Sequence, residues 1–596
     1  MAVLADTGAE SVAWDLSDLY SGPDDPAYTR DAEELLAAAR AFRERHEGTV
    51  ASLDANGLLE LVRELERIAG LVYKVQVYSN FLFDAEASEE RGAFVQRAEE
   101  LYRGVTTELL FFDVEWAARD EADVERLLAD PALADYRYAL ESRRRFRRFL
   151  LSAPEERIAA EKSITGIDTW RRLNTELLSR IRVELDGEEV STAEATARLE
   201  TVADRDERRR TSEALGRALD REIRMRAFVL NTVANDRAVE DRIRGYPTWI
   251  SAFNLSHRIS DDAVDALVEA VTRRYDIGRR HLRLRARLLG LERLAPYDLM
   301  APIGGESPVI AWPEAREIVV AAYDEFSPTA GEIIGRFFDE SWIDAAIRPG
   351  KTVGAYCARP WPDGHPYILM NYAGSRRDVT TLAHELGHGL HGVLSSIHTY
   401  LNCDIPLTVA ETASVLGESL TYELLRERET DERAQLEILV SQIDGLTRTV
   451  FMPIAGNRFE NAVHTTRRSE GELSVDRING LWVDSLRGWW GDEVVEPDER
   501  ASWWSMYPHF VYAPGYMYPY AFGLLLSFSI YRRWTEERSS FAEPILDFLR
   551  AGSMRPPEEL VSELGFDLAD PAFWDNGLDA IEALVGEAER LAERVA

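Results

Sequence analysis

Residues 381–391 read Thr-Leu-Ala-His-Glu-Leu-Gly-His-Gly-Leu-His. His384 and His388 are four residues apart, so on a helix they lie one turn apart on the same face. Two imidazoles placed in this way can bind one zinc ion, and Glu385 is close enough to act on a water held by that ion. The stretch therefore predicts a helix that carries a catalytic zinc site.

A catalytic zinc ion needs a third protein ligand and a position that stays open for water. Glu411 follows His388 by 23 residues, enough for a helix end, a loop and an antiparallel return helix. The spacing alone leaves open whether Glu411 is a ligand or a solvated side chain. Glu418 shares the helix face of Glu411 and could orient a ligand histidine. His391 shares the face of the two histidines, where it could support the ligands, contact substrate or, equally, serve in packing.

A second group of candidates lies at residues 507–520, Tyr-Pro-His-Phe-Val-Tyr-Ala-Pro-Gly-Tyr-Met-Tyr-Pro-Tyr. Hydrolysis of an amide passes through a tetrahedral oxyanion, and neutral hydroxyl or imidazole donors can share its charge with a metal. Four side chains are suitable donors: His509, Tyr512, Tyr516 and Tyr518. Composition alone favours the other interpretation, an aromatic core segment with a turn at Pro514-Gly515.

The composition limits the class of protein. The net charge is −36, from 69 basic and 105 acidic residues, which argues against nucleic acid and anionic membranes as partners. The only two cysteines, Cys357 and Cys403, cannot form a disulfide framework. Residues 1–15 lack the pattern of a signal peptide, and the apolar stretch 519–531 is too short to span a bilayer. We therefore expect a cytoplasmic protein.

Helical periodicity dominates the rest of the chain. Residues 56–83, 85–116 and 192–289 place apolar side chains at three- and four-residue spacing, which predicts helices. Residues 181–190 alternate around Asp-Gly and predict a hairpin. Residues 365–372 are apolar and predict a strand. Because strands are few, the predicted fold class is mainly α.

Three local patterns predict how these elements are joined. Ser375-Arg-Arg-Asp378 is a capping box that would open the zinc-motif helix. Residues 295–313 are rich in glycine and proline, and predict a hinge or a connection between lobes. The arginine-rich residues 143–149 stand among acidic residues, so a salt-bridged helix face is the favoured interpretation over a nucleic-acid patch.

Motifs spread over nearly the whole chain resemble one enzyme family, the zinc oligopeptidases that include thimet oligopeptidase and oligoendopeptidase F. The shared features are the His-Glu-Leu-Gly-His stretch, Glu-Thr-Ala-Ser from Glu411, and the His-Phe and Tyr-x-Tyr-x-Tyr pattern in residues 509–520. Three more stretches are similar to the oligoendopeptidase F branch: Trp14-Asp-Leu-Ser-Asp-Leu-Tyr20, Lys351-Thr-Val-Gly-Ala-Tyr-Cys357 and Tyr367-Ile-Leu-Met-Asn-Tyr-Ala-Gly-Ser-Arg-Arg-Asp378.

The resemblance implies a mainly α fold, a two-lobed helical bowl that encloses a deep substrate channel, with a small β-sheet near the zinc site. We expect an N-terminal helical lobe or lid at residues 1–205 and a catalytic domain at residues 206–596. The extended segment before the zinc helix is expected to be an edge strand that pairs with the substrate backbone.

The resemblance also assigns roles to residues. Glu411 becomes the third ligand, with one Zn²⁺ per chain, and His509 with a downstream tyrosine becomes the pair of oxyanion donors. Gly515-Tyr516 departs from the Phe-Tyr that the branch often has, so the choice of tyrosine stays open. Among Tyr512, Tyr516 and Tyr518, we favour Tyr518.

These features together predict a zinc-dependent endopeptidase that hydrolyses short, unfolded oligopeptides, with Glu385 as general base for a zinc-activated water. A first alternative is a metallocarboxypeptidase on a related scaffold, in which Arg376 or Arg377 would hold the substrate's terminal carboxylate. A second is a peptide-binding protein without catalysis, against which the intact Glu385 argues. The sequence does not indicate an oligomeric state.

Overall fold

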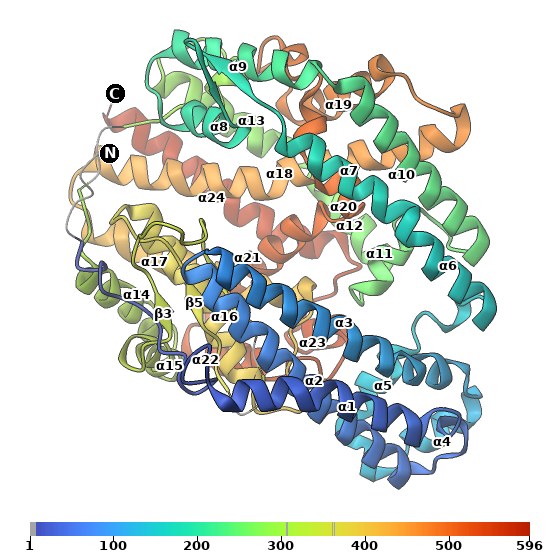
Figure 1. The fold of residues 1–596 in the computed structure, drawn as a ribbon. Helices are drawn as coiled ribbons and strands as arrows, with labels where there is room; N and C mark the ends of the chain where they lie inside the picture. Colours follow the sequence, from blue (N-terminus) through green and yellow to red (C-terminus); the bar gives the residue numbers. More distant parts are fainter. Residues whose placement is uncertain (1–6, 305–307, 360, 363, 596) are drawn as a thin grey trace. The chain divides into compact units, whose positions relative to one another are not determined.

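The structure, a computed structural model, describes residues 7–304, 308–359, 361–362 and 364–595. Its contacts divide the chain into two compact units, each described here by itself (Figure 1). Unit 1 consists of Met1–Arg148, Ser307–Leu425 and Arg533–Phe566, and unit 2 of Phe149–Glu306, Arg426–Arg532 and Asp567–Ala596. Each unit is therefore assembled from stretches that are far apart in the sequence.

Unit 1 is built mostly of helices. They are α1 (Pro26–His46), α2 (Ala55–Ala85), α3 (Glu89–Ala118), α4 (Glu121–Leu128), α5 (Arg137–Arg143), α14 (Trp312–Phe326), α15 (Pro328–Asp339), α16 (Arg376–Ser395), most of α17 (Leu407–Arg428), α22 (Ser539–Arg550) and α23 (Pro557–Glu563). Helices α1, α2 and α3 pack side by side (Figure 1). Asp54 and Ser88 cap α2 and α3 by accepting hydrogen bonds from backbone N–H groups of the first turn. The two long helices expected at residues 56–83 and 85–116 are thus confirmed.

A small three-stranded sheet precedes α16 in unit 1. Its strands are β3 (Ile343–Asp344), β4 (Tyr356–Cys357) and β5 (Ile368–Leu369), in the order β3-β5-β4. Strand β5 pairs parallel with β3 and antiparallel with β4. The buried Lys351 ammonium donates to Asp344 Oδ1 at 2.6 Å and to the Met370 carbonyl at 2.5 Å, which ties the ends of β3 and β5 together.

This topology corrects one prediction. The strand expected within residues 365–372 is present as β5, but it is the central strand and not an edge strand, because β3 and β4 cover both of its sides. In the described part of the chain, β4 is an edge of this sheet. The sequence could not show this, since β3 and β4 have only two residues each and acquire their partners through tertiary contacts.

Unit 2 is also mainly helical. Its helices are α6 (Ala153–Thr165), α7 (Ile167–Ser179), α8 (Thr192–Thr201), α9 (Arg205–Asp220), α10 (Ile223–Arg244), α11 (Ser251–Ser256), α12 (Asp261–Arg273), α13 (Tyr275–Leu288), α18 (Glu432–Glu470), α19 (Val475–Trp490), α20 (His509–Tyr512), most of α21 (Tyr518–Glu537) and α24 (Pro571–Val595). The expected hairpin is confirmed as β1 (Val183–Leu185) and β2 (Glu188–Val190). Its turn residues Asp186 and Gly187 both have positive φ, at 52° and 87°, which suits a two-residue hairpin turn.

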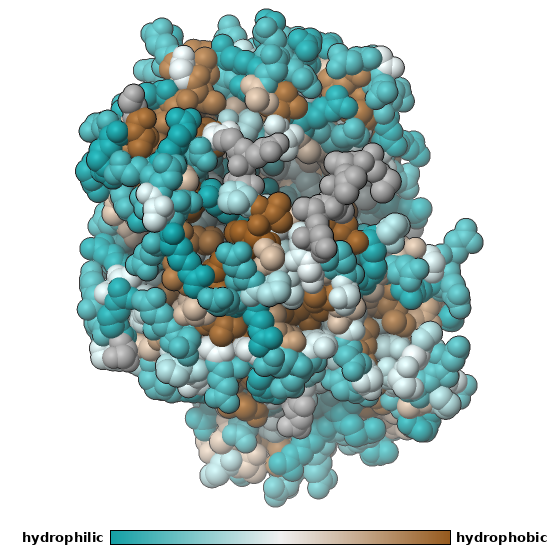
Figure 2. Space-filling view, turned by 90° about the vertical axis from the view of Figure 1, so that its left-hand side faces the viewer, coloured by the Kyte–Doolittle hydropathy of each residue, from teal (hydrophilic) through white to brown (hydrophobic). Residues whose placement is uncertain are grey.

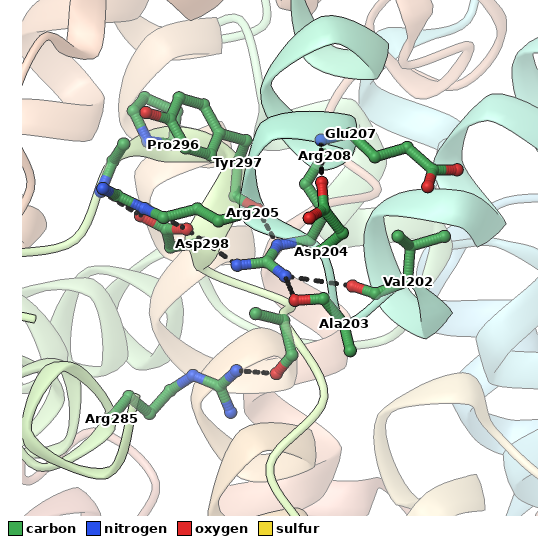
Figure 3. Close-up of polar contacts among 12 residues, drawn as sticks. Val202, Ala203, Asp204, Arg205, Glu207, Arg208, Arg285, Pro296, Tyr297 and Asp298 are labelled. Carbon is green, nitrogen blue, oxygen red and sulfur yellow. Dashed lines mark hydrogen bonds and ion pairs between the residues drawn. The ribbon is translucent and has the colours of Figure 1, made fainter. Parts of the chain in front are cut away.

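One buried ion cluster ties the start of α9 to residues 296–298. The fully buried Asp298 accepts hydrogen bonds from Arg205 Nη2 at 2.8 Å and Arg208 Nη2 at 3.0 Å (Figure 3). The Arg208 guanidinium also donates to the carbonyls of Val202 and Ala203. Loss of one arginine would leave a buried carboxylate short of a partner, which is strongly destabilising.

Several other predictions can be compared with the structure. The fold class, mainly α with small sheets, is confirmed. In the arginine-rich residues 143–149, Arg143 pairs with Asp113, and Arg144 and Arg147 pair with Glu121, as a salt-bridged face requires. One boundary between the contact units, after Glu306, falls in the glycine- and proline-rich connection.

Two predictions about large-scale organisation stay predictions. The division into residues 1–205 and 206–596 concerns functional domains, whereas the contact units change at other residues. The enclosed channel was implied by the resemblance alone.

The face drawn in Figure 2 is largely hydrophilic with scattered hydrophobic side chains. Among the described residues, no helix combines the length and the apolar character that a membrane span requires.

Candidate metal centre

The histidine motif lies on α16, and the start of this helix is fixed by the predicted capping box. Ser375 Oγ accepts from the Asp378 N–H, and the Asp378 carboxylate accepts from the Ser375 N–H at 3.0 Å. One turn further on, Tyr323 donates from its hydroxyl to the carbonyl of Ala383 at 2.8 Å. These contacts hold α16 in place immediately before His384.

Two glycines allow close packing around the motif, Gly387 between α16 and α17 and Gly417 between α17 and α14. A Cβ atom on Gly387 would lie only 2.3 Å from the carbonyl oxygen of Ala413 on α17. A Cβ atom on Gly417 would collide with the hydroxyl of Tyr323. The glycine inside the His-Glu-Leu-Gly-His stretch is therefore needed for packing, and the close approach brings Glu411 opposite the two histidines.

The three predicted ligands converge. Glu411 Oε2 lies 3.4 Å from His384 Nε2 and 3.5 Å from His388 Nε2. One donor atom from each of the three residues lies within 4.8 Å of the other two. Ligand atoms at about 2.0–2.1 Å from a tetrahedral zinc ion are roughly 3.3 Å apart. The spacing and the donor set of two imidazoles and a carboxylate thus fit zinc, and the described residues offer no comparable group elsewhere.

Neighbouring groups orient these ligands. His384 Nδ1 lies 3.3 Å from Glu418 Oε2, so an N–H at Nδ1 would donate to this carboxylate and leave Nε2 free for a cation. The backbone of Ala410 opposes the effect of burial on the pKa of His388. Ser414 donates from its hydroxyl to Glu411 Oε2 at 2.7 Å. The contact between Glu418 and His384 supports the prediction that Glu418 orients a ligand histidine.

The pKa of each of the three candidate ligands depends on at least one of the other two. Burial would lower the pKa of His384, but the hydrogen bond with Glu418 and the charge of Glu411 outweigh it and raise this pKa to about 9. Burial lowers the pKa of His388 to about 4. Although burial favours protonation of Glu411, the two histidines hold its pKa low. The cluster thus favours one excess proton on His384, which a divalent cation would replace.

Glu385 is placed beside the ligands but is not one of them. Its side chain is buried, and burial together with the charge of Glu411 raises its pKa to about 7, against the opposing effects of His384 and the Cys357 backbone. Cys357 belongs to the edge strand β4, and its backbone favours the charged form of Glu385. A carboxylate with a pKa near neutrality is suited to accept and return a proton at physiological pH.

His391, for which three roles stayed open, is 1% exposed. Its Nδ1 is buried and has no hydrogen-bond partner among the described residues. Burial lowers its pKa to about 3, so the ring is neutral. The packing role is therefore favoured over contact with a substrate.

The candidate oxyanion donors belong to unit 2, and their exposure differs from one residue to the next. Tyr518 is fully buried at the start of α21, and its hydroxyl has no hydrogen-bond partner among the described residues. Its ring packs edge-on against Phe253, with the ring centroids 5.9 Å apart. Tyr512, in contrast, is 67% exposed. The burial of Tyr518 fits the aromatic-core interpretation of this residue.

The same segment brings His509 together with two other tyrosines. His509 Nε2 lies 3.2 Å from the Tyr520 hydroxyl, and its ring stacks on Tyr516 with a centroid distance of 5.8 Å. The rings of Tyr516 and Tyr520 are 5.6 Å apart. Tyr520 is not among the candidates from the sequence, because Tyr516 lies in the turn before α21 and helical spacing does not relate the two residues.

Comparisons with known proteins agree with this geometry. The family model described as Peptidase family M3 matches residues 320–580, and the model described as Oligopeptidase F matches residues 115–182. Oligopeptidase PepF of Bacillus subtilis is 24% identical over 98% of this chain and 87% of its own length. Group B oligopeptidase PepB of Streptococcus agalactiae is 24% identical over 98% of both chains.

Solved structures show the same fold. A structure from Chlamydophila abortus superimposes with a TM-score of 0.86 at 21% identity, covering 97% of this chain and 98% of its own. Oligoendopeptidase-F from Enterococcus faecium gives a TM-score of 0.72 at 23% identity, covering 95% and 99%. The chain is a peptidase whose residues 320–580 match the Peptidase family M3 model, with similarity to oligoendopeptidase F over nearly its whole length.

Proposed function

We propose that this peptidase is a zinc-dependent endopeptidase that hydrolyses internal bonds of short oligopeptides. The observation that carries the proposal is the convergence of His384, His388 and Glu411, with Glu385 beside them. The names of the relatives, oligopeptidase and oligoendopeptidase, support the class of substrate.

The residues divide the chemistry between them. Zinc held by His384, His388 and Glu411 would act as a Lewis acid on the scissile carbonyl and on the attacking water. Glu385 takes the proton of that water and delivers it to the leaving amine, which requires a group that is readily protonated and deprotonated near neutral pH. Glu418 orients His384 and Ser414 orients Glu411.

The substrate backbone is proposed to pair with β4. This strand is an edge of the small sheet, and it lies against α16, the helix that carries Glu385. An extended peptide that adds to such an edge gains backbone hydrogen bonds irrespective of its side chains. A peptide on β4 would thus run past the proposed general base.

His509, Tyr516 and Tyr520 are proposed as the oxyanion donors in place of the set centred on Tyr518. The three rings contact one another, and none of the three residues is fully buried. Tyr518 has no such access. The chemistry required is a neutral donor that strengthens its bond as the oxyanion develops.

One experiment tests the proposal. The purified protein is incubated with a mixture of short peptides with and without a metal chelator, and the products are identified by mass spectrometry. Internal cleavage that stops with chelator and returns with Zn²⁺ is expected. Cleavage that is unaffected after complete removal of metal would contradict the zinc requirement.

Two further substrates separate the alternatives. A peptide with an amidated C-terminus should be cut as well as the free acid, whereas a carboxypeptidase would need the carboxylate. A native globular protein should stay intact, because unfolding it would cost about 5–15 kcal/mol. Binding of peptides without any cleavage would favour the non-catalytic alternative.

A further inference from the structure

Glu460 is a buried carboxyl group without a cationic partner in the described structure. It lies on α18 and is 2% exposed. Its Oε1 accepts a hydrogen bond from the N–H of Gly515 at 2.8 Å, and its Oε2 is buried with no partner among the described residues. Burial raises the pKa of Glu460 to about 8, so the group is largely protonated at neutral pH. A buried polar group with so few partners is costly, which calls for a reason for its presence.

The partner of Glu460 is the turn that joins α20 to α21. Gly515 is buried and has φ +98°, a conformation that residues with a side chain rarely adopt. A Cβ atom there would also lie 3.0 Å from Phe253. Because the turn is buried at this point, the Gly515 N–H would lack a partner without Glu460.

A second contact from the same helix face supports this turn. Gly456 lies one turn before Glu460 on α18, and a Cβ atom on it would lie 2.6 Å from Met517 Cε. Helix α18 thus holds the segment at Gly515 and at Met517, on either side of Tyr516. His509 lies before the turn and Tyr520 after it, so the turn sets how these three rings meet.

We propose that Glu460 is a positioning residue of the peptidase: its hydrogen bond to Gly515 fixes the turn that brings His509, Tyr516 and Tyr520 together. The inference rests on the proposed function, in which these side chains stabilise the oxyanion. Glu460 itself touches neither substrate nor metal. It acts as a hydrogen-bond acceptor, a role that a glutamine carbonyl can also perform.

The test compares two replacements of similar size. Glu460→Leu removes the acceptor, whereas Glu460→Gln keeps it. In the leucine variant we expect faster amide hydrogen exchange in residues 513–517 and a roughly 10- to 100-fold lower kcat with little change in KM, because the donors are displaced and not removed. The glutamine variant should restore both measurements. Thr447→Val, a buried change elsewhere on α18, is the matched control and should alter neither.

Other outcomes overturn the inference. Unchanged exchange in the leucine variant, or a glutamine variant as impaired as the leucine variant, would show that the acceptor does not hold the turn. If exchange rises while kcat stays normal, positioning for catalysis is refuted. Tyr520→Phe then decides what failed: a large loss of kcat preserves the oxyanion proposal, and no loss removes that proposal as well.

A variant on the other side of the bond covers the case in which Glu460→Leu does not fold. Gly515→Ala strains the same turn through its positive φ. It should lower kcat selectively and accelerate exchange in residues 513–517. Normal kcat and exchange in Gly515→Ala would overturn the inference without any variant of Glu460.

Discussion

The metal centre on α16 and α17 and the aromatic segment 507–520 both present histidines with other polar side chains, but they reach their geometry differently. In the metal centre, regular helices set the spacing, so His384 and His388 face one point and the facing helix adds Glu411. In the aromatic segment, a four-residue helix, a turn and the start of α21 follow one another. Neighbouring tyrosines there differ from fully buried to 67% exposed. Helical spacing thus fixes function in the first region, and packing fixes it in the second.

The largest expected effect lies in the metal centre. Glu385→Gln should lower kcat by about 10²- to 10⁴-fold, because a general base is lost, while metal content and melting temperature stay near those of the unchanged protein. Steady-state kinetics with elemental analysis measures this. Glu332→Gln, an exposed change on α15, is the control. Near-normal turnover with metal bound would show that Glu385 is not the general base, despite its position on the helix.

The second prediction tests whether packing identifies the donor in the aromatic segment. Tyr520→Phe should lower kcat by roughly 10²- to 10³-fold with a smaller change in KM, as for loss of one oxyanion donor. Tyr518→Phe should leave kcat near normal, since it removes a buried hydroxyl without a partner among the described residues. The opposite result would identify Tyr518 as the donor and show that exposure in the packed structure does not indicate which tyrosine acts.

A smaller effect is expected for the group that orients a ligand. Glu418→Gln removes the negative charge next to His384 Nδ1 and should weaken metal affinity by about 10- to 100-fold. Competition with a chelator of known affinity measures the change. If affinity is unaltered, the helix geometry alone holds His384, which would sharpen the contrast with the aromatic segment.

The last prediction concerns stability and pH in the second region. The pKa of Glu460 is raised from 4.5 to about 8 by burial, so between these values the folded state holds a proton that the unfolded state releases. The free energy of unfolding should therefore fall as pH rises through this window, by up to about 1.4 kcal/mol per pH unit, and level off below and above it. Glu460→Gln should lose this component. Denaturant titrations of both proteins from pH 5 to 8 measure the difference, and parallel pH profiles would contradict it.

The difference between the regions also explains what could be predicted from the sequence. His384, Glu385 and His388 follow from helical spacing, and the capping box at Ser375 follows from local hydrogen bonding. Glu411 needed the resemblance, because its distance from the histidines depends on how two helices pack. The long helices and the hairpin were predictable for the same local reason.

The remaining features depend on contacts between distant parts of the sequence. The identity of the edge strand required the pairing of β3 and β4 with β5, which two-residue strands do not signal. The different settings of Tyr518 and Tyr520 depend on which of them is buried in the packed core and which lies beside His509. Glu460 stands outside every motif, and its partner Gly515 is 55 residues further along the chain.

The close contact at Gly387 has a consequence for protein engineering. Because a Cβ atom on Gly387 would lie 2.3 Å from the Ala413 carbonyl oxygen, the spacing of α16 and α17 and the distance between the proposed metal ligands both depend on this contact. Grafting the five-residue motif onto another scaffold would transfer two ligands and a base but not the third ligand. A centre that could be transplanted would consist of α16 and α17 with the Tyr323 side chain. Gly387→Ala would disturb the distances among the proposed ligands without altering any of these ligands.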